Sequence, residues 1–374
     1  MAKKIRVLHM APPIVNNGIY KYIFTLLRYI DRDRFAFDFL MQAPEALMET
    51  EEYKEYRFGI RAFTTTQRED PGKFREEIYR ILSGGYDVLE LHTSYWRGFM
   101  IEEIAMEVGI PKVIVHSHSS GLDNNDPGER ERQSALHEEF KSRFSDQYAT
   151  DFWACSGEAA DWLFGCRVPR EKIRIVHNAI DIGRYAFDPV ARDRERKAAG
   201  LEASFVVGST GRLEYQKNHA FLLRAFRLLK EKAGNAKLML VGEGRLKGEL
   251  EDLAKELGIY EDVLFMGWRD DVPQLLQAMD VYCLPSRFEG LGIGLVEAQS
   301  AGLACIASTM VPAEANISGS FTALELDERA WAREILKYKD GYGRFSPLEE
   351  IREKGFDIRK EIKWIEEAYG GGGL

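Results

Sequence analysis

The chain has 374 residues, of which 45% are hydrophobic and 30% charged, with a formal net charge of −9 and four cysteines that form no CxxC pair. That length fits two α/β domains, and the negative charge argues against a nucleic-acid-binding protein, which needs clustered lysines and arginines. Without paired cysteines or a run of about 18 apolar residues, the sequence indicates neither a zinc or redox centre nor a membrane-spanning helix.

The first half of the chain alternates short apolar runs with helical patterns. Apolar runs separated by helices indicate parallel strands that are covered by helices on both faces. The sequence therefore predicts a Rossmann-like, doubly wound domain over residues 1–178. Its predicted strands are IRVLHM (5–10), FAFDFLM (35–41), YDVLELH (86–92), KVIVHSH (112–118), DFWACS (151–156) and KIRIVHN (172–178).

The helix predicted after Gly18, IYKYIFTLLRYIDRDR (19–34), carries basic residues beside a broad apolar face. Two interpretations stay open for it. The apolar face either packs on a sheet, as in ordinary amphipathic helices, or lies on a membrane surface. The basic residues are Lys21, Arg28, Arg32 and Arg34.

The second half of the chain repeats the pattern of the first. The polar segment 179–200 lacks a sustained apolar period and predicts a linker, followed by a second Rossmann-like domain over 201–352. A last amphipathic helix, 353–370, is expected to return to the N-terminal domain. The strands predicted in the second domain are FVVGSTGRL (205–213), KLMLVGEG (237–244), VLFMGW (263–268), VYCLPS (281–286) and ACIAS (304–308).

The segment LPSRFEGLGIGLVEAQSAG (284–302) has the layout of a strand end, a glycine-bearing loop and the start of a helix. Ligands of open parallel sheets bind beyond the carboxyl ends of the strands, and a helix N-terminus favours a phosphate group. Glu297, inside the helix, suits the hydroxyls of a ribose, and Glu289 suits a sugar beyond the phosphates. A glycoside hydrolase is disfavoured, because its carboxyls lie about 5–9.5 Å apart whereas eight helical residues rise about 12 Å.

Two cations, Arg212 and Lys217, directly follow the predicted strand FVVGS. A planar guanidinium and a mobile ammonium together suit a diphosphate. The sequence contains no GxxxxGK[ST] loop and no spaced GxGxxG, which disfavours a P-loop enzyme and a dinucleotide-dependent dehydrogenase.

The chain resembles glycosyltransferase family 4, retaining enzymes with the GT-B fold, over nearly its whole length. The second half carries this resemblance in GRLEYQKNHAFLLRAF, LMLVGEG, VPAEANISG and VLFMGWRDDVPQLLQAMDVYCLPSRFEGLGIGLVEAQSAGLACIAS. The first half carries it in NNGIYKYIFTLLRYID, VIVHSHSS, FWACSGEAADWLFG and IRIVHNAID. The resemblance implies an α/β fold of two Rossmann-like domains facing across a cleft.

The resemblance also implies roles for individual residues. Arg212 and Lys217 would bind the leaving diphosphate, Glu289 the donor sugar and Glu297 the ribose. His118 would act near the reacting sugar, with His116 as the alternative. The turn Asn17–Gly18 would close on the donor or the acceptor. The other implied binding positions are Gly211, Gly290, Leu291, Gly292 and Ile293 around phosphate and sugar, and Gly267, Trp268 and Arg269 at the nucleobase. Where the family usually has Gly-Gly, this chain has Asn17-Gly18.

The implied reaction is transfer of a sugar, with retention, from a nucleotide diphosphate donor such as a UDP-sugar to a hydroxyl of a lipid-linked or oligosaccharide acceptor. This activity would serve bacterial exopolysaccharide or capsule biosynthesis. Neither a cofactor nor a metal is expected, because two cations and a helix end already offset the diphosphate charge. We expect a cytoplasmic enzyme, and the basic helix is compatible with peripheral contact at the inner face of the plasma membrane.

Two other functions remain open on the same fold. One is a nucleotide-sugar epimerase or phosphorylase, which would alter the donor in the absence of an acceptor. The other is a non-catalytic sugar-nucleotide-binding subunit. The presence of Glu289, Arg212, Lys217 and His118 together argues against the second, since a degenerate site often loses one such residue.

Overall fold

The computed structural model describes residues 3–13, 15 and 17–371, which divide into two compact units. Unit 1 contains the described residues of Met1–Leu122, Glu131–Ala179 and Ile358–Leu374. Unit 2 contains Asp123–Arg130 and Ile180–Asp357. A short segment from the first half of the sequence therefore belongs to the second unit.

Unit 1 is built on a seven-stranded sheet in the order β3-β2-β1-β4-β5-β6-β7, and all of its strand pairs are parallel. The order reverses at β1, which lies between β2 and β4. The strands are β1 (Ile5–Met10), β2 (Phe35–Met41), β3 (Gly59–Ala62), β4 (Val88–Thr93), β5 (Lys112–Ser117), β6 (Asp151–Ala154) and β7 (Ile173–Ile175).

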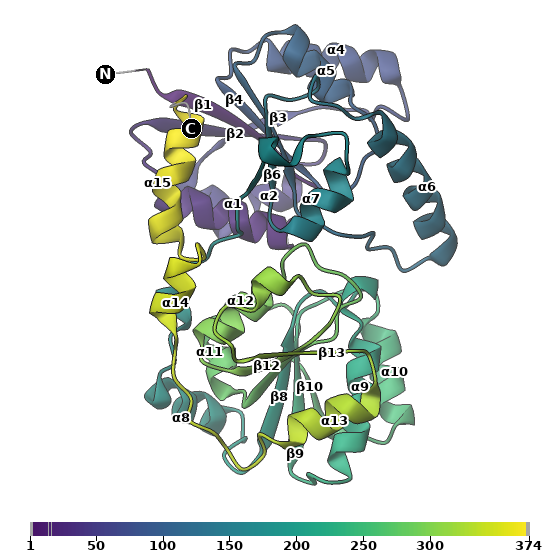
Figure 1. Ribbon diagram of the computed structural model, residues 1–374, viewed down its shortest axis with the longest axis vertical. Coiled ribbons are helices and arrows are strands. Elements are labelled where there is room, and N and C mark those ends of the chain that lie inside the picture. The colour runs from purple at the N-terminus through teal and green to yellow at the C-terminus, as the bar shows by residue number, and fades with distance from the viewer. Residues whose placement is uncertain (1–2, 14, 16, 372–374) are drawn as a thin grey trace. The chain divides into compact units, whose positions relative to one another are not determined.

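Helices cover both faces of this sheet (Figure 1). α1 (Gly18–Tyr29) and the C-terminal helix α15 (Ile358–Tyr369) contact each other and share one hydrophobic core with β1 and β2. α4 (Pro71–Leu82) and α5 (Met100–Glu107) pack together on the other face. The remaining helices are α2 (Glu45–Met48), α3 (Glu51–Tyr56), α7 (Gly157–Phe164), η1 (Arg170–Lys172) and α6 (Pro127–Arg143), which belongs to unit 1 from Glu131 onward.

The structure supports the first interpretation of the basic helix. The apolar residues of α1 are buried in the core that it shares with the sheet and α15. The basic residues near its end also have partners: Arg32 lies 3.6 Å over the ring of Tyr56, and Arg34 pairs with Glu366 at 3.2 Å. The apolar face of α1 is therefore occupied by the protein itself.

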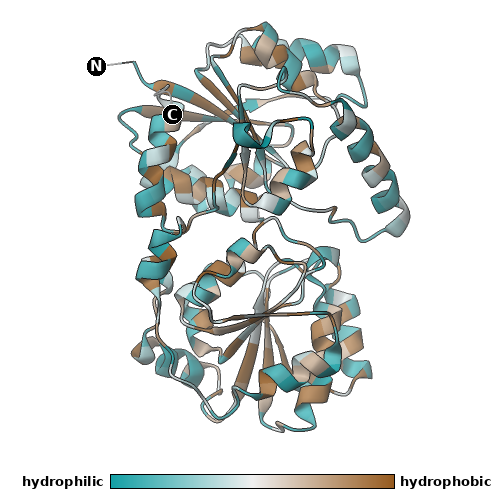
Figure 2. Ribbon diagram, in the orientation of Figure 1, coloured by the Kyte–Doolittle hydropathy of each residue, from teal (hydrophilic) through white to brown (hydrophobic). Residues whose placement is uncertain are grey.

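Unit 2 is built on a six-stranded parallel sheet in the order β10-β9-β8-β11-β12-β13, which reverses at β8. The four central strands of this order are buried along almost their whole length, and Figure 2 shows the sheet largely in the apolar colour. They are β8 (Phe205–Thr210), β9 (Ala236–Val241), β10 (Val263–Phe265), β11 (Val281–Leu284), β12 (Ala304–Ser308) and β13 (Phe321–Leu324).

Two helical layers enclose the sheet of unit 2 (Figure 1). One layer consists of α9 (His219–Lys230), α10 (Lys247–Glu256) and α13 (Glu328–Leu336), and the other of α8 (Pro189–Ala198), α11 (Val272–Ala278) and α12 (Ile293–Ser300). Unit 2 ends with α14 (Leu348–Glu353), and its short helices are η2 (Ile182–Tyr185), η3 (Tyr215–Lys217), η4 (Tyr260–Asp262) and η5 (Ala313–Ala315). The two sheets, each parallel and doubly wound, confirm the predicted fold class.

The segment that the sequence presents as a linker, 179–200, contains η2 and α8. Asp188 caps α8 by accepting a hydrogen bond from the Val190 amide at 2.9 Å, and Pro189 stands in the first turn, where its missing N–H costs nothing. Arg192 and Arg196 of α8 both pair with Asp280. The segment is therefore polar because the arginines of α8 form ion pairs within unit 2, to which α8 belongs.

Both sheets reverse their strand order beside a central strand, which creates a switch point between β1 and β4 in unit 1 and between β8 and β11 in unit 2. Loops that follow two such strands diverge to opposite faces of the sheet and leave room for a ligand. Asn17 and Gly18 follow β1, Arg212 and Lys217 follow β8, and Glu289 follows β11. Each unit therefore presents one candidate region.

Candidate active site

The loops after β8 and β11 are hydrogen-bonded to each other at the switch point of unit 2. The Arg287 amide donates to the Gln216 carbonyl at 2.8 Å, and Asn218 Nδ2 donates to the Pro285 carbonyl at 3.2 Å. Asn218 has a left-handed backbone, with φ of 53°, which is uncommon for a residue other than glycine. These contacts hold the segment around Lys217 against the segment around Glu289.

Lys217 and Glu289 form an ion pair between these two loops. Lys217 Nζ lies 2.6 Å from Glu289 Oε1, and Glu289 is only 4% exposed. Two further groups donate to the same carboxylate, the Ser286 hydroxyl at 2.6 Å and the Gln216 side chain at 3.1 Å. The carboxylate is therefore fixed in position, and the ammonium beside it keeps 16% of its side chain exposed to meet a further anion.

The N-terminus of α12 lies next along the chain. The helix is preceded by Gly290, Leu291 and Gly292, and it begins at Ile293. Gly292 occupies the N-cap position with φ of 90°, where other residues are strained, and it offers no capping side chain. The first amides of α12 thus form an end with partial positive charge, which is suited to a phosphate.

Glu297 lies in the second turn of α12 and is 1% exposed. Its Oε1 accepts a hydrogen bond from the Tyr185 hydroxyl at 2.6 Å. Tyr185 belongs to η2, in the segment predicted as a linker. The two acids of the sequence motif therefore have different environments, because Glu289 is held by a cation and Glu297 by a neutral phenol.

Arg212 has a partner that the sequence did not indicate. Its guanidinium pairs with Asp123 at 2.6 Å and remains 32% exposed. The other oxygen of Asp123 accepts from the Gln216 amide at 3.0 Å, and Asn125 Oδ1 accepts from the Tyr215 amide at 2.8 Å. A carboxylate of the segment Asp123–Arg130 therefore binds the guanidinium that was expected to bind a phosphate.

Gly211 precedes Arg212 with φ of 141°, and a Cβ there would lie 2.9 Å from the Lys217 side chain. Both the backbone conformation and the close approach of Lys217 thus favour glycine at position 211.

The loop after β10 contains the residues that the resemblance assigns to the nucleobase. The Gly267 carbonyl accepts from the Gly242 amide at 2.9 Å, Trp268 is 57% exposed, and Arg269 pairs with Asp271 at 2.7 Å.

In unit 1, His116 and His118 stand at the end of β5, beside the switch point. His118 Nε2 lies 2.9 Å from His92 Nδ1, and His116 Nδ1 lies 2.8 Å from Glu90 Oε1. Burial lowers the pKa of His118 well below its usual value, as does the neighbouring His116, whereas Asn178 opposes this shift. Burial also lowers the pKa of His116 to about 3. Both imidazoles are therefore neutral at pH 7.

Asn17 and Gly18 lie at the start of α1. Asn17 is the N-cap, and its Oδ1 accepts from the amides of Ile19 at 2.9 Å and Tyr20 at 3.0 Å. Its backbone is extended, with φ of −138°, so the chain does not use the left-handed conformation that asparagine tolerates. The asparagine that replaces the family's first glycine thus acts as a helix cap.

The structure brings Lys217 together with Glu289 and places Arg212 and Glu297 in the same unit; His116, His118, Asn17 and Gly18 belong to the other unit. Ser286 and Gln216 were missed although they lie within the motifs, because neither is charged and neither is a glycine. Asp123 and Tyr185 gave no signal, since each lies far along the chain from the residue that it contacts.

Two groups among the described residues could hold a metal ion: His92, His116 and His118, and His9, Glu90 and His92. In the structure their ring nitrogens are engaged mainly with one another and with Glu90.

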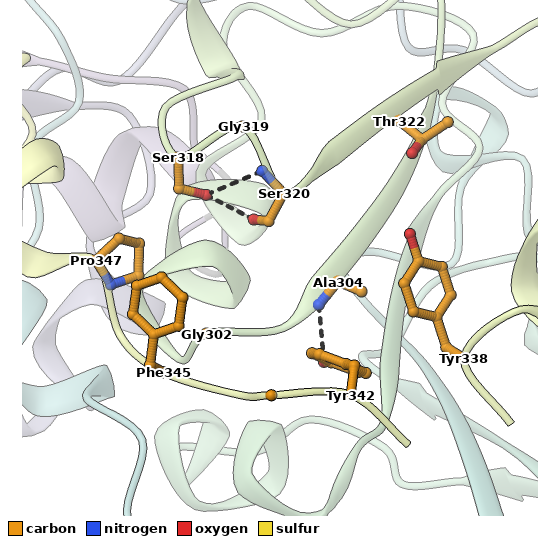
Figure 3. A pocket seen from close by; sticks show the side chains of 11 residues that line it. Gly302, Ala304, Ser318, Gly319, Ser320, Thr322, Tyr338, Tyr342, Phe345 and Pro347 are labelled. Carbon is orange, nitrogen blue, oxygen red and sulfur yellow. Dashed lines mark hydrogen bonds between the residues drawn. The ribbon is translucent and has the colours of Figure 1, made fainter. Parts of the chain in front are cut away.

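A separate pocket of about 270 Å³ lies in unit 2 (Figure 3). It lies at the N-terminal ends of β12 and β13, whereas the predicted site residues follow the C-terminal ends of the strands. It is lined by Tyr338, Tyr342, Phe345 and small residues, and it contains none of the predicted site residues.

Two family profiles match the chain. Glycosyltransferase Family 4 matches residues 16–184, and Glycosyl transferases group 1 matches residues 191–340. EpsF of Bacillus subtilis (strain 168), named as a glycosyltransferase, is 30% identical over 339 residues, which are 89% of this chain and 87% of EpsF. The UDP-Gal:alpha-D-GlcNAc-diphosphoundecaprenol alpha-1,3-galactosyltransferase of Escherichia coli is 26% identical over 304 residues, 78% of this chain and 77% of that protein.

Solved structures share the fold at low sequence identity. Alr3699/HepE of Anabaena, in complex with UDP and glucose, has a TM-score of 0.75 and 18% identity and covers 98% of this chain and 99% of its own. A glycosyltransferase of Rickettsia africae has a TM-score of 0.76 and 14% identity, and 98% of each chain is covered.

None of the helices in the described ranges is long and apolar enough to cross a bilayer. The chain belongs to glycosyltransferase family 4 and is a glycosyltransferase with the GT-B fold.

Proposed function

We propose that this enzyme transfers a sugar from a UDP-sugar to a hydroxyl of a lipid-linked or oligosaccharide acceptor, with retention of the anomeric configuration, in the biosynthesis of a cell-surface polysaccharide. The observation that carries the proposal is the ion pair of Lys217 with the buried Glu289, next to the N-terminus of α12 at the switch point of unit 2. A cation, a helix end and a fixed carboxylate form a site for a phosphorylated sugar.

The chemistry follows from the charges of this site. Departure of a nucleoside diphosphate builds negative charge on the phosphate oxygens, and Lys217, Arg212 and the first amides of α12 are placed to stabilise it. Such preorganised charge stabilisation is often the largest single contribution to catalysis. Glu289 would accept hydrogen bonds from the sugar hydroxyls, and Glu297 from the ribose. The acceptor attacks from the face that the diphosphate leaves, and a diphosphate oxygen takes its proton.

The donor and acceptor classes are supported by the relatives. The Escherichia coli relative is named for a UDP-Gal donor and a diphosphoundecaprenol acceptor, and the Anabaena structure contains UDP and glucose. A Campylobacter jejuni relative, 33% identical over 153 residues, is also named for a diphospho-undecaprenol acceptor. We propose a cytoplasmic enzyme that meets such an acceptor at the inner membrane face and that needs neither a cofactor nor a metal.

A screen of nucleotide sugars tests the donor class. A ligand at 100 times its dissociation constant adds about 2.7 kcal/mol to the free energy of unfolding, so thermal shift should single out one UDP-sugar. NMR of the product formed with a prenyl-diphosphate saccharide should show the donor's anomeric configuration, and turnover should persist in excess EDTA. An inverted product would refute retention. Conversion of the donor without an acceptor would favour an epimerase, and loss of turnover in EDTA would show that a metal is needed.

The ribose role of Glu297 has its own test. We expect Glu297→Ala to weaken UDP binding by about ten- to a hundredfold, because hydrogen bonds to a charged group contribute about 1.5–3 kcal/mol. Isothermal titration calorimetry with UDP measures the loss. Inorganic pyrophosphate lacks a ribose and should bind the variant as it binds the wild type. Tyr185→Phe, which removes only the phenol from Glu297, is the matched control; equal UDP affinity in Glu297→Ala and wild type would contradict the assignment.

A further inference from the structure

Two arginines lie over one tyrosine ring in unit 2, beside the candidate active site. The guanidinium carbon of Arg130 lies 3.8 Å from the centroid of the Tyr215 ring, and that of Arg287 lies 4.7 Å from it. Arg130 ends the segment Asp123–Arg130, which belongs to unit 2, and Arg287 lies in the loop after β11. One aromatic ring thus brings together two cations from distant parts of the chain.

Hydrogen bonds hold both parts of the chain against η3, the short helix that contains Tyr215. The Tyr215 amide donates to Asn125 Oδ1 at 2.8 Å, in the segment that carries Arg130. The Arg287 amide donates to the Gln216 carbonyl, also at 2.8 Å. The backbone near each arginine is therefore fixed relative to the ring.

The two guanidiniums are bound to neutral oxygens rather than to acids. Arg130 donates to the Asn124 carbonyl at 2.6 Å, and Arg287 donates to Asn218 Oδ1 at 2.9 Å. Neither forms an ion pair with a carboxylate in the part of the chain that the structure describes. A guanidinium has several further N–H donors, so each keeps donors for another partner. Two neighbouring cations without a counter-ion favour the binding of an anion.

Other arginines of the same region have internal counter-ions. Arg212 pairs with Asp123 at 2.6 Å, and Arg245 pairs with Glu214 at 3.3 Å. Two acids next to the arginine pair are therefore already engaged. The missing compensation of Arg130 and Arg287 is a property of these two side chains and not of every arginine in the region.

The place of the pair in the chain indicates which anion it binds. Tyr215 precedes Lys217 by two residues in η3, and Arg287 precedes Glu289 by two residues. The arginine pair therefore borders the donor site, where the donor diphosphate is assigned to Lys217, Arg212 and the N-terminus of α12. An acceptor sugar that is linked to a lipid through a diphosphate brings a second diphosphate, one sugar ring away from the attacking hydroxyl.

We propose that Arg130 and Arg287, held over Tyr215, bind the diphosphate of a lipid-linked acceptor. The planar guanidinium presents parallel N–H groups that match the oxygens of a phosphate. This inference rests on the proposed function and narrows it to acceptors whose sugar is attached to the lipid through a diphosphate. Tyr215 is a positioning residue in this site, because its ring holds the two arginines together.

Kinetics with two matched acceptors test the assignment. One acceptor is a prenyl-diphosphate saccharide, and the other carries the same saccharide on a neutral alkyl chain of equal length. The double variant Arg130→Gln, Arg287→Gln should raise KM for the first acceptor by about ten- to a hundredfold, as expected for lost hydrogen bonds to a charged group. Its KM for the alkyl acceptor should not change. An unchanged KM for the diphosphate acceptor, or an equal rise for both acceptors, would overturn the proposal.

Two further variants separate the site from general charge and from the ring. Arg245→Gln removes a nearby arginine that has a carboxylate partner, so KM for the diphosphate acceptor should stay at the wild-type value. A rise equal to that of the double variant would show that only the overall charge matters. Tyr215→Phe keeps the ring and should behave as the wild type, whereas Tyr215→Ala should raise the same KM. Equal values in these two variants would refute the positioning role of the ring.

Calorimetry tests the anion site without turnover. Geranyl diphosphate is titrated into protein saturated with UDP, so that the donor phosphate site is occupied. We expect it to bind the wild type and not the double variant, and geraniol, which lacks the diphosphate, to bind neither. UDP affinity should be equal in both proteins, which also reports an intact fold. Should the double variant not fold, Arg287→Gln, at an exposed residue, should show a smaller loss of the same kind.

The same titrations distinguish the possible failures. Geranyl diphosphate that binds only in the absence of UDP, or weaker UDP binding in the double variant, would assign the arginines to the donor site and overturn the proposal. Equal binding of geraniol would show that the prenyl chain is recognised instead of the diphosphate. If the wild type transfers sugar to neither acceptor, the proposed function fails, and the calorimetry still decides whether the second anion site exists.

Discussion

Lys217→Ala is expected to lower kcat by about 10²–10³-fold, the usual effect of removing one group that stabilises transition-state charge. The ammonium pairs with Glu289 at 2.6 Å, and it lies next to the α12 N-terminus. Removing it leaves the departing diphosphate with less compensation at the point where its charge grows. Steady-state kinetics with saturating donor and acceptor measure the change.

The same substitution also strands a buried carboxylate, and this effect must be separated from catalysis. Loss of one partner of a buried ion pair costs about 3–5 kcal/mol, so the Tm of Lys217→Ala should fall together with kcat. The double variant Lys217→Met, Glu289→Gln contains no unpaired charge and should recover most of the Tm without recovering kcat. Recovery of kcat with the Tm would show that Lys217 has only a structural role.

The pairing of Lys217 with Glu289 illustrates what the sequence can predict. The two residues are 72 positions apart, yet both directly follow strands of one parallel sheet. Because such strands end at the same edge and the order reverses between them, apolar runs and glycine spacing suffice to bring the residues together. The role of Glu289 as a charge partner of Lys217 was not predicted, because the sequence assigned each residue to the ligand alone.

The elements that the sequence missed have weak apolar signals for a physical reason. β3 and β13, with sequences GIRA and FTAL, are four-residue strands at the sheet edges and are only partly buried. An edge strand has a neighbour on one side only, so a continuous apolar run is not required of it. α8 was missed because the residues that it packs against the rest of unit 2 include arginines, which bind Asp280 and the carbonyls at the end of α11.

Asp123 could not have been found from the sequence. It lies 89 residues before Arg212, in a segment between β5 and α6 that has no pattern of its own. Its contact depends on how that segment joins unit 2, which is a tertiary property. The contact also bears on function, because the carboxylate pairs with the guanidinium that a diphosphate would need.

Arg212→Ala is expected to lower kcat by about 10²–10³-fold, with a smaller loss in Arg212→Lys, which keeps the charge but not the planar fork.

The contact between Arg212 and Asp123 makes a second variant, at Asp123, informative. Asp123→Asn removes the competing charge and keeps Arg212, so it should bind UDP more tightly than the wild type if the diphosphate displaces the carboxylate. Calorimetry with UDP and steady-state kinetics on both variants measure these effects. Weaker UDP binding together with a lower kcat in Asp123→Asn would show instead that the carboxylate orients the guanidinium for the diphosphate. A near-wild-type kcat in Arg212→Ala would remove Arg212 from the mechanism, leaving Lys217 and the N-terminus of α12 to stabilise the departing charge.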